Sequence, residues 1–452
     1  MKKIVLSAAA LIFAATGFAQ FNNSDVNQVG SGNASTVTQT GFMNDSDVDQ
    51  LGDNNDSDVT QTGAENGSIV LQGPASNDNE SDVTQTGNDN DSFVWQDGDF
   101  NDSEVDQTGN DNDSFVDQYG DNNDSDVDQT GNNNSSTVLQ GYNGDNHTSI
   151  VLQVGNDNTS WVGQDGDSNF SEVYQIGNGN DSEVTQIGND NYSGVEQQGD
   201  DNTSEVDQTG DDNFSIAIQL GNDNDSDMDQ LGDDNVAITE QFGNDNTQSI
   251  NQVGDNNYAG TGQYGDNNTS IVNQTGDDNY SLVIQDGNFN GSAVNQTGND
   301  NISDVFQDGN ANNSLVNQNG NDNLSIVEQI GNNNGSGVAQ VGDDNESYVL
   351  QVGTLNNSSV LQSGDNNYSE VDQFGLGNFS DVKQFGDDNF SDVNQSGDFN
   401  ISGVIQTGFL HTSEVNQTGN SNTSTVLQTG NNHNSLVNQI GNGNSSVVTQ
   451  SN

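Results

Sequence analysis

The sequence lacks several residue types on which most globular proteins depend. It has no Cys, a single Pro, and only three Lys and Arg residues among 452, against 70 Asp and Glu. The absence of Cys excludes disulfide scaffolds, thiol catalysis and Cys-based zinc sites. The net charge of −67 argues against nucleic acid as a partner, because two polyanions repel each other. Only 28% of the residues are hydrophobic, too few for one large apolar core.

The first residues have the pattern of an export signal. A basic start at residues 1–3 precedes an apolar stretch at residues 4–13, and Gly17 and Ala19 supply small residues for cleavage. This pattern predicts a signal peptide over residues 1–19 and a mature chain over residues 20–452. The apolar stretch is too short to span a bilayer, and no later stretch approaches ~18 apolar residues. We therefore expect a secreted protein with no membrane span.

An 11-residue repeat occupies the rest of the chain. Gln recurs at this spacing from Gln28 to Gln450, at thirty-nine positions, and only the intervals after Gln72 and Gln140 are longer, at 13 residues. Gly stands two residues after the Gln in 36 of the 39 units. A short period kept over a whole chain predicts a stacked array rather than separate domains. The two longer intervals are expected to add surface bulges in the turns.

Each unit has the pattern of a strand followed by a tight turn. The frame Asn-x-Ser-x-Val-x-Gln alternates fixed and variable residues, which is the strand period, and the following Gly-x-x is rich in residues that tolerate positive φ. Many variable positions are Asp, which cannot be buried without partners, so the fixed residues should face inward. We expect Val and Ser to fill a thin core, and Asn and Gln to form amide ladders from copy to copy. The representative inward positions are Gln39, Gln50, Gln61, Gln107, Gln129, Asn44, Asn101, Asn123, Ser46, Ser103, Ser125, Val48, Val105 and Val127, and the turn positions are Gly41, Gly109 and Gly131.

Two units are expected to close one rung of a coil. Thr follows Gln in alternate early units, as at Thr40, Thr62 and Thr86, which favours a 22-residue rung with two facing sheets. Later units lose this alternation, which leaves a three-sided coil open. The thirty-nine units predict an all-β fold, a two-sided β-solenoid of about 19 rungs and about 90 Å in length.

The frame resembles the curlin repeat of curli, the bacterial functional amyloid. The stretch from Gln39 to Gln50 has the spacing Gln-x-Gly-x-x-Asn-x-Ser-x-x-x-Gln, with Gly41, Asn44 and Ser46 in place, and the resemblance covers residues 22–450. It implies export from a Gram-negative-type bacterium through an outer-membrane pore, then nucleated assembly into extracellular fibres. Such fibres serve biofilm matrix, cell adhesion and surface colonisation. The implied partners are further copies of the chain, a nucleator and the outer-membrane secretion machinery.

Candidate chemistry is sparse, and we expect no enzyme. The three His residues, His147, His411 and His433, all occupy the Asn position of the frame, so they are interpreted as ladder substitutions rather than ligands. Carboxylates recur throughout by periodicity, so no pair of them indicates acid–base catalysis. No cofactor is expected, apart from Ca²⁺ as a non-specific counterion. Aromatic residues in variable positions, such as Tyr192 and Phe214, are expected to cover sheet faces or to join filaments laterally.

The ends and the charge of the array bear on assembly. Asn22 to Gln28 and Asn444 to Gln450 keep the internal frame rather than that of a capping unit, so we expect head-to-tail stacking into filaments. A charge of about 0.75 per Å would exceed the ~0.6 per Å of duplex DNA, so salt or divalent cations should promote assembly. Two alternatives stay open at this point. One is a nucleator, and the other is a monomeric acidic β-solenoid with an ice-, mineral- or Ca²⁺-binding surface.

Overall fold

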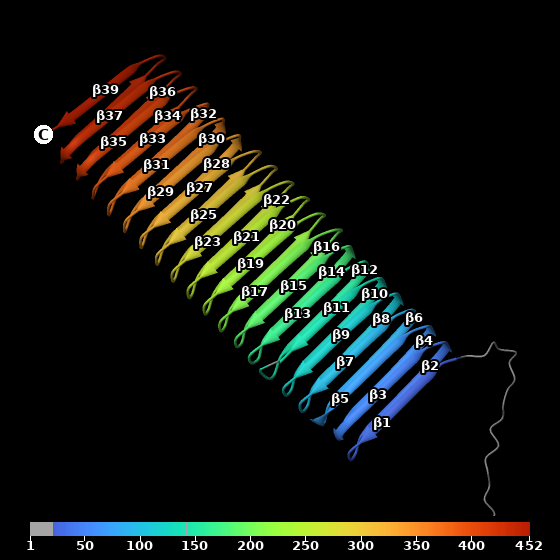
Figure 1. Ribbon diagram of the computed structural model, residues 1–452. Coiled ribbons are helices and arrows are strands. Elements are labelled where there is room, and N and C mark those ends of the chain that lie inside the picture. Colours follow the sequence, from blue (N-terminus) through green and yellow to red (C-terminus); the bar gives the residue numbers. More distant parts are fainter. Residues whose placement is uncertain (1–20, 142) are drawn as a thin grey trace, which may run out of the picture.

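The computed structural model describes residues 21–141 and 143–452; the predicted leader, residues 1–19, lies outside this part of the chain. The described residues form thirty-nine strands and no helix. Figure 1 shows the strands as successive rungs of a straight rod, from the blue N-terminal strands to the red C-terminal ones. The predicted two-sided β-solenoid of about 19 rungs is confirmed, and the three-sided coil is excluded.

The strands alternate between two parallel sheets, in which each strand pairs with the strands two before and two after it in the sequence. The odd sheet contains β1 (Asn23–Val29), β3 (Asp45–Asp53), β5 (Gly67–Asn77), β7 (Asp91–Asp97), β9 (Asp113–Tyr119), β11 (Ser135–Gln140), β13 (Thr159–Asp165), β15 (Asp181–Ile187), β17 (Thr203–Thr209), β19 (Asp225–Leu231), β21 (Thr247–Val253), β23 (Thr269–Thr275), β25 (Gly291–Thr297), β27 (Asn313–Asn319), β29 (Gly335–Val341), β31 (Asn357–Ser363), β33 (Phe379–Phe385), β35 (Ile401–Phe409), β37 (Thr423–Asn431) and β39 (Ser445–Ser451). The even sheet contains β2 (Ala34–Phe42), β4 (Asp56–Ala64), β6 (Glu80–Asn88), β8 (Asp102–Asn110), β10 (Asp124–Asn132), β12 (Thr148–Asn156), β14 (Phe170–Asn178), β16 (Tyr192–Gln198), β18 (Phe214–Leu220), β20 (Val236–Phe242), β22 (Tyr258–Tyr264), β24 (Tyr280–Asp286), β26 (Ile302–Asp308), β28 (Leu324–Asn332), β30 (Glu346–Thr354), β32 (Tyr368–Leu376), β34 (Phe390–Ser396), β36 (Thr412–Thr418) and β38 (Asn434–Ile440). We call the outer surfaces of the two sheets the odd face and the even face.

The register places identical frame positions on top of one another. Between β8 and β10, for example, Val105 pairs with Val127 and Gln107 pairs with Gln129. Side chains alternate between the two faces of a strand, so this register sends Ser, Val and Gln of every unit to the same side. The burial pattern follows, with buried fixed residues and exposed or half-buried variable residues along interior strands such as β8 and β10. No Asp or Glu among the described residues is fully buried.

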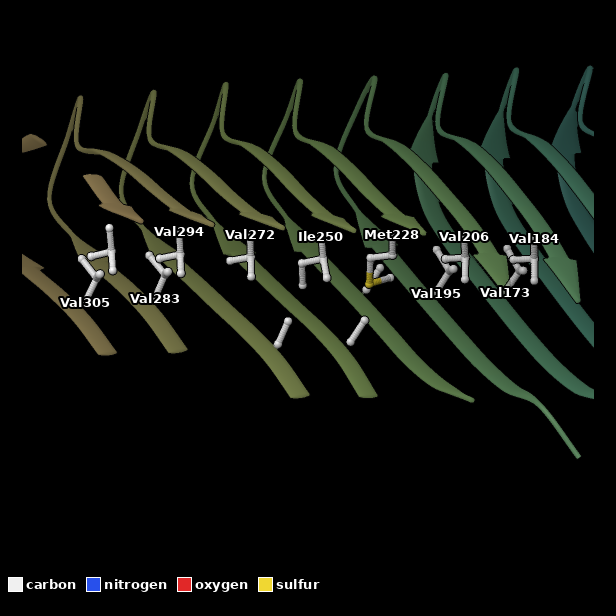
Figure 2. Close-up of a cluster of buried hydrophobic side chains, with 14 of the residues drawn as sticks. Val173, Val184, Val195, Val206, Met228, Ile250, Val272, Val283, Val294 and Val305 are labelled. Atoms are coloured by element: carbon white, nitrogen blue, oxygen red, sulfur yellow. The ribbon is translucent and has the colours of Figure 1, made fainter. Parts of the chain in front are cut away.

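The core is a narrow seam between the sheets, in which the Val side chains form rows along the rod axis. Figure 2 shows these rows from Val173 to Val305, with Met228 and Ile250 taking two of the Val positions. Consecutive strands run in opposite directions, so the Ser position of one strand faces the Val position of the next. The hydrogen bond of 2.8 Å between the hydroxyls of Ser226 in β19 and Thr239 in β20 fixes this arrangement.

Substitutions in the seam compensate for one another in volume. β21 carries Ile250 at its Val position, and the Ser positions facing it in β20 and β22 are Ala237 and Ala259. β21 also carries Gln248 at its Ser position, where the facing Val positions hold the smaller, polar Thr239 and Thr261. Protein interiors are close-packed, so a larger side chain on one sheet requires smaller ones opposite it.

The turns explain the recurring Gly. Gly109 has φ of 134°, and a Cβ atom at this position would overlap with the carbonyl oxygen of Gly131 on the next rung. Only Gly fits where both the backbone angle and the space forbid a side chain. The second residue after the Gly has left-handed backbone in most turns, as at Asp111 with φ of 56°, which Asn and Asp tolerate better than other residues.

The first of the two longer intervals differs from the expected bulge in the turn. Its extra residues lie inside β5, where Gln50 pairs with Gln72 but Gly52 pairs with Ser76. The strand therefore bulges after Gln72 and then regains its register, with Ser76 buried beneath the bulge. Pro74 lies in this bulge. The described residues of the second interval, Gly141, Asn143 and Gly144, lie between β11 and β12 and outside any strand, as expected.

The volume match predicts that Ala259→Val destabilises the rod, because the added methyl groups meet Ile250 across the seam. Overpacking of this kind costs about 1–3 kcal/mol. Hydrogen exchange of the backbone amides of β20, β21 and β22 should become faster. Ala293→Val is the matched control: Ala293 lies on the odd face in β25, and the change should leave exchange unaltered. Equal protection of both variants would contradict the volume match.

Candidate functional site: amide ladders and acidic rows

The buried Gln side chains form a continuous hydrogen-bonded ladder in each sheet. Gln107 Nε2 donates to Gln129 Oε1 over 2.9 Å, and Gln129 Nε2 donates to Gln153 Oε1 over 2.9 Å. The second N–H of each amide crosses the seam, as Gln107 does to the backbone carbonyl oxygen of Asp91, 2.8 Å away in the odd sheet. Each Gln therefore joins two rungs and also joins the two sheets. These amides are fully buried, so their hydrogen bonds form away from water.

The Asn side chains form a second ladder at the opposite end of each strand. The backbone N and the Nδ2 of Asn112 both donate to Asn90 Oδ1, over 3.2 and 3.0 Å. Asn112 Nδ2 also donates to the carbonyl oxygen of Gly131 over 3.1 Å, which closes the turn of the next rung. One buried amide thus satisfies polar groups of the strand start, the ladder and the turn.

The two ladders run in opposite directions along the rod. Each Gln donates to the Gln of the following rung, whereas each Asn donates to the Asn of the preceding rung. The side of each rung that faces the C-terminal end of the rod therefore presents Gln donors and Asn acceptors. The side that faces the N-terminal end presents Gln acceptors and Asn donors. The two sides of a rung are chemically different and complementary to each other.

The structure places the sequence-derived inward positions in the seam. Asn44, Ser46, Val48 and Gln50 of the third unit are fully buried. Gln39 is half-buried, because β2 lies near the end of the rod. The remaining buried positions are Gln61, Gln107, Gln129, Asn101, Asn123, Ser103, Ser125, Val105 and Val127. The turn positions Gly41, Gly109 and Gly131 all have φ between 123° and 134°.

Histidine replaces Asn in the ladder at three positions. The backbone N of His147 donates to Asn123 Oδ1 over 3.0 Å, and His147 Nδ1 accepts from the backbone N of Asn169 over 3.3 Å. The ring nitrogen Nδ1 thus takes the role of the Asn Oδ1 atom. Burial lowers the pKa of His147, which favours the neutral ring that this acceptor role requires. His411 and His433 stack on each other with ring centroids 5.2 Å apart.

A third ladder, at the turns, was missed by the sequence reasoning. The backbone N of Asp99 donates to Asp121 Oδ1 over 2.8 Å, and the backbone N of Asp121 donates to Asp145 Oδ1 over 2.7 Å. The residue directly after the recurring Gly is therefore an acceptor for the preceding turn, not only a turn former. The signal was present, because Asp or Asn occupies this position in most units.

The comparison with known families agrees with this geometry. The sequence profile described as Curlin associated repeat matches the chain thirteen times, at residues 22–52, 52–87, 87–120, 120–155, 155–188, 183–210, 199–232, 221–254, 243–276, 303–331, 356–386, 386–419 and 419–451. This chain belongs to the curlin-repeat family. No curated protein matches it.

The curlin-repeat assignment carries coarse functional information. Curlin repeats on a β-solenoid are typical of structural rather than catalytic proteins, and the family points to an extracellular or cell-surface location. Across residues 21–141 and 143–452, no cluster of three or more His, Asp or Glu side chains is arranged to hold a metal ion. The same residues include no helix that is long and apolar enough to cross a bilayer.

Carboxylates of this curlin-repeat protein form rows along its outer faces. On the even face Asp82, Glu104 and Asp126 lie in register in β6, β8 and β10. Burial between neighbouring rungs raises the pKa of Asp126, and nearby carboxylates raise it further. Burial likewise raises the pKa of Asp117 and of Asp392 to about 6. Like charges stacked at the rung spacing oppose folding when they are ionised.

The core also contains polar groups that contribute little to the stability of the fold. Most Ser hydroxyls of the seam, Ser226 being an exception, have no hydrogen-bond partner in the described part of the chain, and that of Ser281 is among the unpaired ones. Gln285 of the same strand instead accepts from Gln263 over 2.9 Å and donates to Gln307 over 2.8 Å. An unpaired buried hydroxyl adds no stability, whereas a broken ladder leaves buried partners unsatisfied.

We therefore expect opposite results from two substitutions in β24. Ser281→Ala should leave the free energy of unfolding unchanged or raise it by up to about 1 kcal/mol. Gln285→Ala should lower it by about 3 kcal/mol, because two neighbouring amides lose their partners and a cavity forms. Denaturant unfolding followed by circular dichroism measures both. Equal losses for the two variants would show that the ladder is not a special source of stability.

Acidification is expected to stabilise the rod. The pKa values of partly buried carboxyls such as Asp117, Asp126 and Asp392 are raised in the folded state, so the folded protein binds protons more readily than the unfolded chain, and the free energy of unfolding rises as the pH falls. This contribution is fully present below pH ~4 and is lost as the pH rises through ~6. The denaturant midpoint should increase between pH 7 and pH 4.5.

Salt provides the control for this prediction. At pH 7, NaCl or CaCl₂ should raise the same midpoint by screening the carboxylates, and at pH 4.5 the salt effect should shrink. A midpoint that falls on acidification would contradict the electrostatic account.

Proposed function

We propose that this protein is a secreted structural protein that assembles end to end into curli-like amyloid fibres, which serve an extracellular biofilm matrix, adhesion and surface colonisation. Removal of the leader at residues 1–19 and export across the outer membrane of a Gram-negative-type bacterium belong to the same proposal. Its support is the curlin-repeat assignment together with the geometry of the two ends of the rod.

The observation that carries the proposal is the polarity of the ladders at the end rungs. At the N-terminal end, Gln28 and Gln39 donate to the following rung, so their Oε1 atoms are the acceptors facing outward. At the C-terminal end, Gln439 and Gln450 accept from the preceding rung, so each has an Nε2 hydrogen facing outward. The donors of one end thus match the acceptors of the other.

The seam also ends in apolar side chains that a further rung would cover. Val26 is 43% exposed in β1, whereas the interior Val48 that pairs with it is 0% exposed. The outer edges of β1 and β39 present backbone N–H and C=O groups, which another strand can pair. Stacking of one copy on the next would bury the Val side chains, extend both ladders and pair these edges. Such a head-to-tail contact does not close on itself, so it produces a filament.

The test is a variant with two charge substitutions in the first rung. Val26→Asp with Val37→Asp places two carboxylates in the seam at the N-terminal end, where stacking would bury them without partners. Seeded elongation, followed by thioflavin fluorescence and electron microscopy, should slow by at least about tenfold, since ~1.4 kcal/mol already corresponds to that factor.

Asn27→Asp with Thr38→Asp is the matched control. It adds the same charge to the same two strands, at the neighbouring positions that point outward. This control should elongate at close to the wild-type rate at 150 mM NaCl. Equal elongation of both variants, or a wild-type protein that stays monomeric under seeding, would refute end-to-end assembly.

A further inference from the structure

The two outer faces of the rod differ in chemistry over its middle third. The outward side chains are those of the first, third, fifth and seventh residues of each strand. In the seven even strands from β12 to β24, 19 of these 28 residues are Val, Ile, Leu, Phe or Tyr, and four are acidic. In the seven odd strands from β13 to β25, only four of 28 belong to this apolar set, with one Trp besides, and eight are acidic. We call the outward residues of the even strands β12 to β24 the apolar patch.

The aromatic side chains of the apolar patch are ordered by the rung repeat. Phe170, Tyr192 and Phe214 stack in succession, with ring centroids 5.3 and 4.9 Å apart. Tyr258 and Tyr264 extend over Gly260 and Gly262 of their own strand, which leaves both glycines buried. Both faces of a ring inside a stack are covered by its neighbours. The patch is therefore a ridged apolar surface, not a row of free ring faces on which sugar rings could stack.

We propose that the apolar patch is the surface through which a second copy of this chain docks side by side. Seven rungs at ~4.8 Å and strands of seven residues at ~3.3 Å give the patch an area of about 800 Å². A stable protein pair buries about 800 Å² on each partner, so the patch alone is large enough.

A second copy also has the matching period. The apolar rows recur at every rung, so an occupant that fills them along their whole length needs the same repeat of ~4.8 Å, which another copy of the rod provides. Side chains of two such faces can interdigitate over every rung. This lateral contact is distinct from end-to-end stacking and does not depend on it.

Charge favours the apolar patch over the odd face of the same rungs, which has eight acidic outward residues against four in the patch. With a net charge of −67, two rods repel each other wherever their carboxylates meet. The apolar patch has few acids, and two of them are already paired with tyrosines: Tyr264 Oη donates to Glu240 over 2.7 Å, and Tyr192 Oη donates to Glu172 over 3.4 Å. The hydroxyls offset part of the cost of removing these carboxylates from water.

The experiment is a mass-per-length measurement by scanning transmission electron microscopy on the full-length mature chain. The whole chain of 452 residues has a mass of 47.7 kDa and the mature chain is slightly lighter. One rod of about 90 Å therefore has about 0.5 kDa per Å, and paired rods should give twice that value. Ile216→Asp with Ile238→Asp adds two charges at the centre of the patch, on adjacent paired strands. We expect this variant to halve the mass per length and to leave elongation unchanged.

The matched control is Ser249→Asp with Ile271→Asp, which adds the same charges at the equivalent positions of the odd face. This control should keep the doubled mass per length. Ile216→Thr with Ile238→Thr keeps β-branched side chains and adds no charge, so this variant should fold normally. A partial loss of pairing in this variant would show that the loss in the Asp variant does not result from misfolding. Circular dichroism checks that all variants retain their strands.

The outcomes separate lateral pairing from end-to-end assembly. If the rods do not elongate, sedimentation of the short rods still reports pairing as a doubled mass, and the patch variant should then sediment as a single rod. Wild-type rods of single mass at every salt concentration overturn the proposal, whether or not they bind insoluble polysaccharide or lipid vesicles. An equal loss of pairing in the even-face and odd-face charge variants overturns it as well.

Discussion

The structure depends on the hydrogen bonds between buried side-chain amides at the spacing of the rungs. A primary amide carries both donors and acceptors, so a column of identical amides can satisfy itself without water or a charged partner. Gln107 and Asn112 each use this property and additionally bind backbone atoms of the opposite sheet or of the next turn. Val alone could not fix the register of the strands. Each strand contributes only two residues to the middle of the seam, so a strand that slid along its neighbour would lose little apolar contact. The amide columns make a slipped rung costly, since every buried donor and acceptor would lose its partner.

The amide columns also explain how so acidic a chain folds. The ladders occupy the fixed positions, and the strand period sends every other residue outward, where most of the carboxylates meet solvent. The outward rows still repel one another, and this repulsion adds to the effect of burial in raising the pKa of Asp126. Repulsion between the carboxylates therefore opposes folding, and the pH and salt concentration determine how strong that repulsion is. The Gln and Asn ladders run in opposite directions, so the two ends of the rod present different side-chain donors and acceptors. The backbone of the two sheets alone would distinguish the ends less strongly.

Most of the fold follows from the sequence, because the same short rule is repeated thirty-nine times. The period of 11, the alternation within each unit and the recurring Gly give the strands, the turns and the two-sided solenoid. Features that depend on three-dimensional neighbours are harder to read. The match of Ile250 to Ala237 and Ala259 needs the facing register of consecutive strands, which no single unit contains. The bulge inside β5 depends on how two extra residues are accommodated, and length alone does not decide that.

The difference between the odd face and the even face is also hard to predict from the sequence. Tyr192 and Phe214 show no pattern when the chain is read unit by unit, but they fall on one face once odd and even strands are separated. A period of 22 rather than 11 carries that information, and it becomes visible only when the coil is known to be two-sided. The turn ladder of Asp99 and Asp121 was hidden for a different reason, because Asp after Gly already has an adequate explanation as a turn residue.

Hydrogen exchange of the Gln side-chain amides tests the buried amide ladder most directly, measured by solid-state NMR on protein labelled with ¹⁵N and ¹³C at Gln. We expect the Nε2 protons of interior Gln residues to exchange far more slowly than those of free glutamine. We also expect each interior Nε2 to show a through-space correlation to the Cδ of the Gln on the next rung, 22 residues away for Gln107 and Gln129 and 24 residues away for Gln129 and Gln153. Rapid exchange of these side chains with solvent, or the absence of that correlation in folded rods, would contradict the buried amide ladder.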